Sequence, residues 1–249
     1  MKIWAIADLH LSFGVPNKKM DIFGSQWENH DEKIQKNWDN LVSVEDLVLI
    51  PGDVSWAMRL ERALPDLEWI HKRPGKKVLI RGNHDYWWDS LSKLQKVLPA
   101  SIQVIQNNSL LFNDVSISGA RLWDSTEYSF DENIEFIPME RPPKGHEERS
   151  SEEIFVRELG RLELSLKAMA PTAKVKIAIT HFPPIGPDLK PTRASALFEK
   201  YGVSHVVFGH LHSLKKTERQ LFGKARGVEY ILASADWINF CPMQIMIDT

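Results

Sequence analysis

Six short apolar runs constrain the fold of this chain more than any other feature of its sequence. Most of these runs are continuously hydrophobic rather than alternating, which is typical of strands buried on both faces beneath helices. Patterns with helical spacing lie between the runs. Strands that alternate with helices indicate an α/β domain built in layers. The predicted strands are residues 3–7, 47–50, 78–80, 175–180, 205–208 and 230–233.

Apolar stripes predict the helices between these strands. Asn29, with Glu32 three residues on, is expected to cap the helix that carries the stripe at residues 34–42. Ser150 is expected to open the helix that carries the stripe at residues 155–169. Residues 60–70 also have helical spacing, but Pro65 should kink or split a helix there. The other stripes lie at residues 34–42, 91–98 and 155–169.

Two regions depart from this alternation of strands and helices. Residues 102–119 contain short runs separated by Asn107-Asn108 and Asn113-Asp114, which predicts hairpins added to the sheet. Residues 243–247 could supply another strand. Residues 123–153 are polar, acidic and proline-bearing. Because loops of this length inside a compact domain usually have a function or are mobile, we expect either a lid over the site or a solvated insertion.

Composition excludes several classes of protein. With 43% hydrophobic residues, the chain has the apolar content that a core needs and a disordered chain lacks. We expect one domain over residues 1–249. The formal net charge of −2 argues against a broad electrostatic surface for nucleic acid or anionic membranes, although a local basic patch stays open.

The cellular location can also be predicted from the sequence. The single cysteine, Cys241, cannot form an internal disulfide, as expected in a reducing compartment. The apolar start of the chain is interrupted by Asp8 and is too short for a signal peptide. No segment reaches the roughly 20 apolar residues that span a bilayer. We therefore expect a cytoplasmic protein.

Chemically reactive side chains gather directly beyond the predicted strands. Five of the nine histidines fall in five short blocks at these positions. In open α/β sheets the carboxyl ends of the strands line the ligand crevice, so the blocks should converge on one rim. The blocks are Asp8-Leu9-His10, Gly52-Asp53, Gly82-Asn83-His84-Asp85, His181 and Gly209-His210-Leu211-His212.

Each block is a weak signal alone; even Gly-Asn-His-Asp should occur by accident in about one chain in several hundred. Taken together and in order, the blocks resemble the calcineurin-like metallophosphoesterase superfamily, and the match runs from Asp8 to His212. The resemblance implies a four-layer α/β sandwich, in which two mixed β-sheets face each other and helices flank them. It also implies a two-metal site at the strand ends.

The resemblance further implies a role for each matching residue. Nitrogen and oxygen donors without a thiolate suit borderline divalent ions; the resemblance favours Mn²⁺, with Fe/Zn, Mg²⁺, Ni²⁺ or Co²⁺ as alternatives. Two such ions, two aspartates and a bridging hydroxide leave about one positive charge to attract a phosphate ester. The expected ligands are Asp53 as the bridge, Asp8, His10 and His212 on one metal, and Asn83, His181 and His210 on the other.

The expected reaction is hydrolysis of a small phosphate monoester or diester. A metal-bridging hydroxide would attack phosphorus in line, and His84 would donate a proton to the leaving-group oxygen. Asp85 is expected to orient the His84 imidazole and raise its pKa. The alternative for Asp85, compatible with this role, is the N-cap of a helix over residues 86–98.

Two other functions stay open: an inactive interaction scaffold on the same fold, and a metal hydrolase of non-phosphate esters. The complete ligand set argues against the scaffold, and the near-neutral charge weakens a nuclease assignment. Arg121 could bind phosphate in a bidentate manner, although a surface salt bridge is favoured. Nearby aromatic residues could stack on a substrate, with core packing favoured for at least two of them: Trp56, Tyr86, Trp87 and Trp88. The histidines without a predicted role are His30, His71, His146 and His205.

Overall fold

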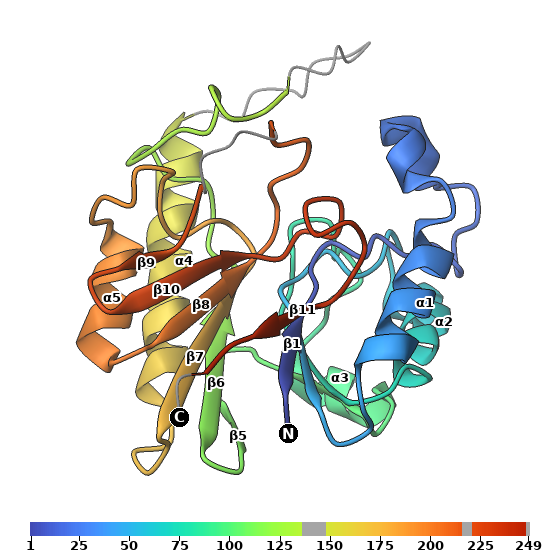
Figure 1. Ribbon diagram of the computed structural model, residues 1–249, viewed down its shortest axis with the longest axis horizontal. Helices are drawn as coiled ribbons and strands as arrows, with labels where there is room; N and C mark the ends of the chain where they lie inside the picture. The colour runs from blue at the N-terminus through green and yellow to red at the C-terminus, as the bar shows by residue number, and fades with distance from the viewer. Residues whose placement is uncertain (136–147, 216–220, 248–249) are drawn as a thin grey trace.

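Two β-sheets lie face to face in the computed structural model, which describes residues 1–135, 148–215 and 221–247 (Figure 1). In spatial order the first sheet contains β11 (Met243–Ile245), β1 (Ile3–Ala5), β2 (Leu47–Ile50), β3 (Lys76–Leu79) and β4 (Ile102–Val104). The second contains β5 (Leu110–Phe112), β6 (Val115–Ala120), β7 (Val175–Thr180), β8 (His205–Phe208), β10 (Val228–Leu232) and β9 (Lys224–Ala225). Both sheets are mixed, because β11, β5 and β9 pair antiparallel with their neighbours while the remaining pairs are parallel.

Helices cover the outer faces of both sheets, which confirms the predicted four-layer α/β sandwich (Figure 1). The outer face of the first sheet packs against side chains from α1 (His30–Leu41), α2 (Leu60–His71) and α3 (Leu91–Val97). The outer face of the second sheet packs against α4 (Glu148–Lys167) and α5 (Arg193–Tyr201). Two short 3₁₀ helices, Met20–Phe23 and Ser25–Trp27, precede α1.

The strands are buried on both faces, which explains their continuous apolar sequences. In β1, Trp4 belongs to the cluster beneath the helices, whereas Ile3 and Ala5 belong to the cluster between the two sheets. In β2, Val48 faces the helices and Leu47 the opposite sheet. Side chains alternate between faces along a strand, so a strand between two apolar layers needs apolar residues at every position.

The region of the predicted hairpins differs from expectation at one of its two turns. Strands β5 and β6 form the expected antiparallel hairpin around Asn113, whose φ of 53° is the left-handed conformation that asparagine tolerates. Strand β4 instead pairs parallel with β3, and residues 105–109 carry the chain to the other sheet. Ile102 and Val104 bury their side chains beneath the helices there, which a hairpin with β5 would not allow.

Three helix predictions need correction. The helix α2 runs unbroken through Pro65, and its buried residues Ala63, Leu67 and Ile70 pack against the first sheet's outer cluster. Asn29 occupies the N-cap position of α1 in a left-handed conformation, and its side chain makes no capping hydrogen bond within the described residues. The third correction concerns α4, which begins at residue 148, two positions before the predicted start.

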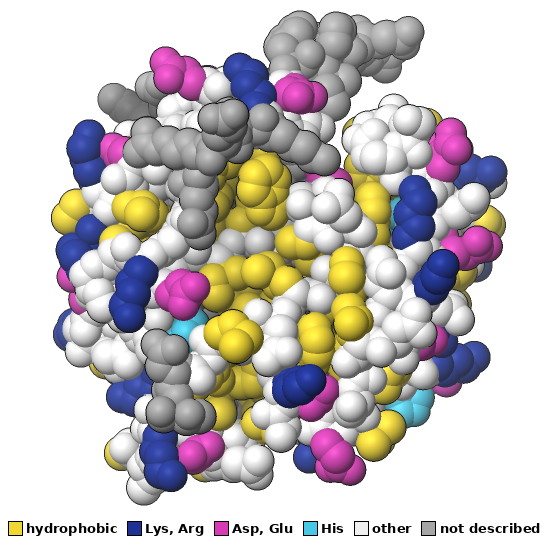
Figure 2. Space-filling view, in the orientation of Figure 1, with side chains coloured by type: hydrophobic (Ala, Val, Ile, Leu, Met, Phe, Trp, Pro, Cys, Tyr) yellow, Lys and Arg dark blue, Asp and Glu magenta, His cyan; other side chains and the backbone are white. Residues whose placement is uncertain are grey.

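The surface shows no single dominant charge on the face drawn in Figure 2, where basic and acidic side chains are interspersed around the periphery. Hydrophobic side chains gather toward the centre of this face. Among the described residues, no helix combines the length and the apolar content that crossing a bilayer would require.

Candidate metal centre

The predicted ligand residues all lie just beyond the carboxyl ends of strands, on one edge of the sandwich. The first sheet contributes the residues that follow β1, β2 and β3, and the second contributes those that follow β7 and β8. The facing sheets therefore bring together side chains that are up to 202 residues apart in sequence. The residues that the structure brings together here are Asp8, His10, Asp53, Asn83, His181, His210 and His212.

The backbone at this edge adopts conformations that most residues avoid. Asp8, His10, Asp53 and His210 have φ values of 58°, 46°, 52° and 73°, in the left-handed region. Such conformations cost about 1–3 kcal/mol each and concentrate at functional sites, where surrounding structure holds them. Gly82 is needed for a different reason, because a Cβ there would overlap Oδ1 of Asp53. These loops therefore hold strained backbone conformations that place the candidate ligand side chains.

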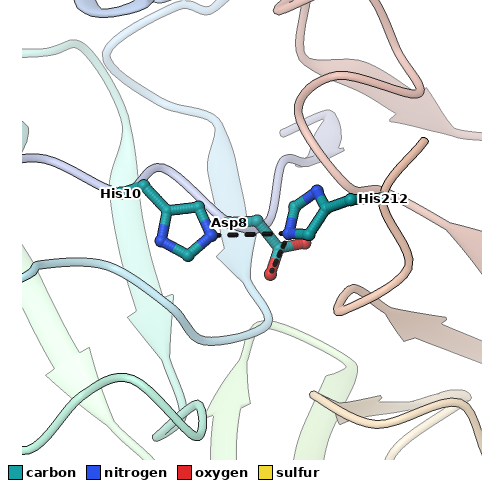
Figure 3. A group of neighbouring side chains, drawn as sticks. All are labelled: Asp8, His10 and His212. Atoms are coloured by element: carbon teal, nitrogen blue, oxygen red, sulfur yellow. Dashed lines mark hydrogen bonds and ion pairs between the residues drawn. The ribbon is translucent and has the colours of Figure 1, made fainter. Parts of the chain in front are cut away.

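One cluster of donor atoms is formed by Asp8, His10 and His212 (Figure 3). Nε2 of His10 lies 3.4 Å from Nε2 of His212, and the latter lies 3.9 Å from Oδ1 of Asp8. One ligand atom from each residue lies within 4.8 Å of the others. Asp8 and His10 are buried, whereas the side chain of His212 is 31% exposed. The cluster thus has the composition and spacing of a cation site that is open on one side.

His212 is oriented by a carboxylate that was not predicted from the sequence, Asp236. Nδ1 of His212 donates to Oδ1 of Asp236 at 2.9 Å, and the backbone N–H of Ser213 donates to Oδ2 at 3.1 Å. These bonds leave Nε2 to face His10, as metal-binding histidines with carboxylate partners do. Burial alone would lower the pKa of His212, but the Asp236 hydrogen bond and the charge of Asp8 raise it to about 9. Metal binding at Nε2 must therefore release a proton.

A second cluster, formed by Asn83, His181 and His210, lies beside the first, and both sheets contribute to it. Nδ1 of His181 donates to the carbonyl oxygen of Pro51 at 2.9 Å, so the neutral ring presents a lone pair at Nε2. This atom lies 2.6 Å from Oδ1 of Asn83, and Nδ1 of His210 lies 3.0 Å from the same oxygen. Ligand atoms of Asp8, Asp53 and His181 also lie within 4.8 Å of one another, an arrangement that a bound cation would satisfy. These residues fit a metal ion.

Asp53 lies between the two clusters. Its Oδ2 is 3.9 Å from Nε2 of His10 and 3.5 Å from Nε2 of His181, so this single oxygen lies beside a histidine of each cluster. Its Oδ1 accepts a hydrogen bond from the backbone N–H of His84 at 2.9 Å, which fixes the carboxylate. This is the position that a carboxylate shared by two ions would occupy.

Burial prepares these residues as ligands. It lowers the pKa of His181 to about 3 and the pKa values of His10 and His210 well below their usual range, so these rings are neutral and carry free lone pairs. Burial also raises the pKa of Asp8 to about 7 and the pKa of Asp53 above its usual value. Two buried carboxylates beside three neutral imidazoles favour positive charge at this place, and the proton on His212 supplies part of it.

Asp85, the predicted partner of the His84 imidazole, forms hydrogen bonds with other groups. The carboxylate of Asp85 accepts hydrogen bonds from the backbone of the 52–55 loop and of Gly82, and from the Trp87 indole, at 2.8–3.2 Å. It therefore ties two ligand-bearing loops together instead of orienting the His84 imidazole. The alternative role as a helix cap is also wrong, since Ser90 occupies the N-cap position of α3.

The environment of His84 is aromatic. Its ring lies 4.6 Å from the Trp56 ring and 5.8 Å from the His10 ring, centroid to centroid. Burial lowers its pKa, and the charge of Asp53 acts in the opposite direction. The prediction that Asp85 raises the pKa of His84 is therefore wrong, because the pKa of His84 is lowered and Asp85 is not among the causes of the shift. Trp56 also stacks on His10 at 4.9 Å, so one indole packs against both histidines.

The remaining aromatic and basic candidates divide clearly. Trp87 and Trp88 are buried in the core, as favoured, whereas Tyr86 is 54% exposed. Arg121 forms the favoured salt bridge, with 3.1 Å between its Nη2 and Oε1 of Glu158. The bridge is not on the surface, because the side chains are 13% and 2% exposed.

Three of the histidines without a predicted role make hydrogen bonds within the fold. A ring nitrogen of His30 lies 3.0 Å from the Leu9 carbonyl oxygen, and one of His205 lies 3.0 Å from that of Met246. His71 contacts a serine hydroxyl at 2.7 Å. The fourth, His146, lies outside the described residues.

The predicted insertion reaches the candidate metal centre in its first part. Residues 123–134 supply much of the lining of a cavity of about 250 Å³ that also touches Phe182, Pro183 and His210. Residues 136–147 of the insertion lie outside the described part of the chain, and residues from 148 onward belong to α4.

Comparisons with known proteins extend these observations. An 84-residue segment is 38% identical to the Gene 66 protein of Mycobacterium phage L5, and an 83-residue segment is 37% identical to that of phage D29. Each segment covers 33% of this chain, and the chain spans about two fifths of these relatives, 39% and 40%. The solved phosphopantetheinyl hydrolase of Mycobacterium tuberculosis shares the fold, with a TM-score of 0.56 and 15% identity over 99% of this chain and 96% of that one.

The sequence also matches a family profile described as calcineurin-like phosphoesterase over residues 1–214. This range includes every candidate ligand from Asp8 to His212. Since the match covers most of the chain, the protein belongs to the calcineurin-like phosphoesterase family.

Proposed function

We propose that this protein is a metal-dependent phosphoesterase that holds two divalent ions at the rim shared by its two sheets. The observation that carries the proposal is the convergence of ligand atoms in two adjoining groups, Asp8 with His10 and His212, and Asp8 with Asp53 and His181, in each of which the atoms lie within 4.8 Å of one another. Family membership supports phosphoester hydrolysis as the reaction.

When bound, the ions would activate a water molecule for in-line attack on phosphorus and offset negative charge on the phosphoryl oxygens. The chain's residues do the positioning. Asp53 holds a single oxygen, Oδ2, beside both clusters, and the hydrogen bond from the His84 backbone N–H to its Oδ1 keeps the carboxylate from rotating. Asp8 accepts from the backbone N–H of His210 at 2.9 Å, which joins the loops of the two sheets.

His84 is the proposed proton donor to the leaving-group oxygen. Its imidazole lies beside His10 and against the face of Trp56, so it is next to the cluster without being one of the expected ligands. A positioned donor of this kind typically contributes 10²–10⁴-fold to the rate. Asp85 supports the reaction indirectly, because it holds the loops that carry Asp53 and His84.

The cavity beside His210 is the proposed site for the leaving group. It is lined by Trp123, Tyr128 and Phe182, which offer aromatic faces to an apolar or planar group. Its position supports a specificity role for the insertion at residues 123–153, of which the first part forms the wall.

Mn²⁺ is the proposed metal, because nitrogen and oxygen donors without sulfur suit borderline ions. The core shared by both sheets supports our prediction that residues 1–249 form one domain. The proposed substrate is a small phosphate ester, with the cytoplasm as the proposed location.

Parallel assays test this function. Protein loaded with Mn²⁺ is offered bis(4-nitrophenyl) phosphate, 4-nitrophenyl phosphate and 4-nitrophenyl acetate, and its metal content is measured by mass spectrometry. We expect two ions per chain and turnover of at least one phosphate. Turnover of the acetate alone would favour the non-phosphate hydrolase, and a protein that binds no metal would favour the inactive scaffold.

A further inference from the structure

A second cavity lies on the same edge of the sandwich, toward strands β4 and β5. Its volume is about 280 Å³, and the guanidinium-bearing residues Arg81, Arg121 and Arg161 line it. Arg81 directly precedes the Gly82-Asn83 turn of the candidate metal centre. The carbonyl oxygen of Arg121 accepts hydrogen bonds from the backbone N–H groups of His181, at 3.1 Å, and of the next residue. The cavity and the metal centre therefore share their supporting loops.

Positive charge exceeds negative charge in this cavity. The buried carboxylate of Glu158 pairs with two of the three arginines, at 3.1 Å to Arg121 and 2.7 Å to Arg161. Asp89 also lines the cavity, but its Oδ2 lies 2.9 Å from Nζ of Lys93, so its charge is already matched. One carboxylate thus faces three guanidinium groups.

Two of these guanidinium groups have donors to spare. Among the described residues, nothing accepts a hydrogen bond from the buried Nε atoms of Arg81 and Arg121. Buried N–H groups of folded proteins nearly always have an acceptor, so these two show that the arginine cluster beside the cavity is incompletely satisfied. The planar guanidinium matches phosphate oxygens in a bidentate geometry.

We propose that this cavity binds a second phosphate of the substrate, separate from the phosphoryl group that is hydrolysed. The proposal rests on the phosphoesterase function and narrows its substrates to esters that carry another phosphate. The volume is just under the roughly 300–1,000 Å³ of sites for whole ligands, as expected for one group of a larger molecule. The excess positive charge would hold that group while the scissile ester lies at the metal centre.

The first test measures anion binding without metals. Metal-stripped protein is titrated with inorganic phosphate by calorimetry, with acetate as a second probe. We expect Arg161→Gln, and the double variant Arg121→Gln, Glu158→Gln, to raise the Kd for phosphate about tenfold. The double variant removes both members of the buried ion pair, so it leaves no lone buried charge. Binding of acetate as tight as that of phosphate would overturn the choice of phosphate.

The matched control is Arg157→Gln. Arg157 lies on the same helix, is 57% exposed, and is 3.9 Å from Glu158 without lining the cavity. The Arg157→Gln variant loses the same charge as Arg161→Gln. If the cavity is the site, the Kd of Arg157→Gln for phosphate should stay within twofold of the wild-type value. Equal phosphate affinities in Arg161→Gln and Arg157→Gln would overturn the proposal.

The second test uses Mn²⁺-loaded protein and two substrates that differ by one phosphate, adenosine 3′,5′-bisphosphate and adenosine 5′-monophosphate. We expect Arg161→Gln to raise KM for the bisphosphate about fivefold more than for the monophosphate. An equal change for both would overturn the role in substrate binding. If neither phosphate ester is hydrolysed while phosphate binding still depends on Arg161, the phosphoesterase function fails and the anion site stands.

Discussion

The candidate metal centre and the arginine cavity lie on the same edge of the sandwich, but their unsatisfied groups are opposite. At the metal centre, lone pairs of histidine, asparagine and aspartate face one another and need a cation. In the cavity, three arginines gather around the carboxylate of Glu158, and among the described residues the buried Nε atoms of Arg81 and Arg121 have no acceptor. One edge can therefore hold metals and a polyanionic ester side by side. Changes at the metal centre should alter metal content and rate, whereas changes in the cavity should alter anion affinity.

Asp53→Asn should have the strongest effect, because it halves the charge that two ions share and weakens both clusters at once. We expect bound Mn²⁺ to fall and kcat to drop about 10³-fold, in line with several kcal/mol of metal-derived stabilisation. Metal analysis and phosphodiester assays measure both. Asp39→Asn, at an exposed aspartate that pairs with Arg73, is the control that removes the same charge elsewhere. Unchanged metal content in Asp53→Asn would contradict the shared position.

His84→Ala separates proton donation from metal binding. We expect kcat to fall about 10²–10⁴-fold with the metal content nearly intact, since His84 lies beside the cluster rather than in it. His71→Ala removes a histidine remote from this edge and should retain full activity. Full activity in His84→Ala would show that another group protonates the leaving oxygen.

Asp85→Ala should act on stability. It leaves backbone N–H groups of two loops and the Trp87 indole without their acceptor, and unpaired buried donors cost about 1–3 kcal/mol each. We expect the free energy of unfolding to fall by about 3 kcal/mol or more, measured in urea. A smaller loss in Asp85→Asn, which retains one oxygen, would support hydrogen bonding as the cause. No loss in either variant would contradict the loop-tying role.

Asp236→Asn tests the orientation of His212. The amide cannot match the charged hydrogen bond to Nδ1, so we expect the affinity for Mn²⁺ to fall about 10–100-fold. Activity should return at high Mn²⁺ concentration, because the ligands themselves are present. A Mn²⁺ titration followed by activity measures the shift, and an unchanged midpoint would argue that Asp236 does not orient the ring.

Glu158→Gln gives the smallest change and the opposite sign. It removes the carboxylate that opposes the arginines, so phosphate should bind about two- to fivefold more tightly, while metal content stays at the wild-type level. Calorimetry on the metal-stripped protein measures it. Weaker binding would mean that the carboxylate positions the arginines more than it competes with phosphate.

Much of the architecture followed from local sequence. Strands β2, β7 and β8 lie where continuous apolar runs predicted them, because strands buried on both faces tolerate little else. The convergence of the candidate ligand residues was also predictable, since short blocks such as Asp8-Leu9-His10 follow their strands. These signals are local: each lies within about ten residues of the structure that it predicts.

Other features depended on which elements become neighbours in the folded chain. Strand β4 pairs with the edge of β3 instead of forming the expected hairpin, and there Ile102 and Val104 join the apolar layer beneath the helices. Asp85 accepts hydrogen bonds from backbone N–H groups of a loop about 30 residues earlier in the chain. No spacing in the sequence predicts such a contact, because it depends on how two loops dock.

Asp236 and the arginine cavity show the same limit. Asp236 follows β10, which lies beside β8 in the sheet, so it meets His212 although 24 residues separate them. Arg81, Arg121 and Arg161 come from three elements and become one cavity only when the sheets and α4 pack. Local sequence therefore specified which side chains are the candidate metal ligands. The tertiary packing decided which carboxylate orients a ligand and which charges collect beside the site, because both depend on distances between segments far apart in the chain.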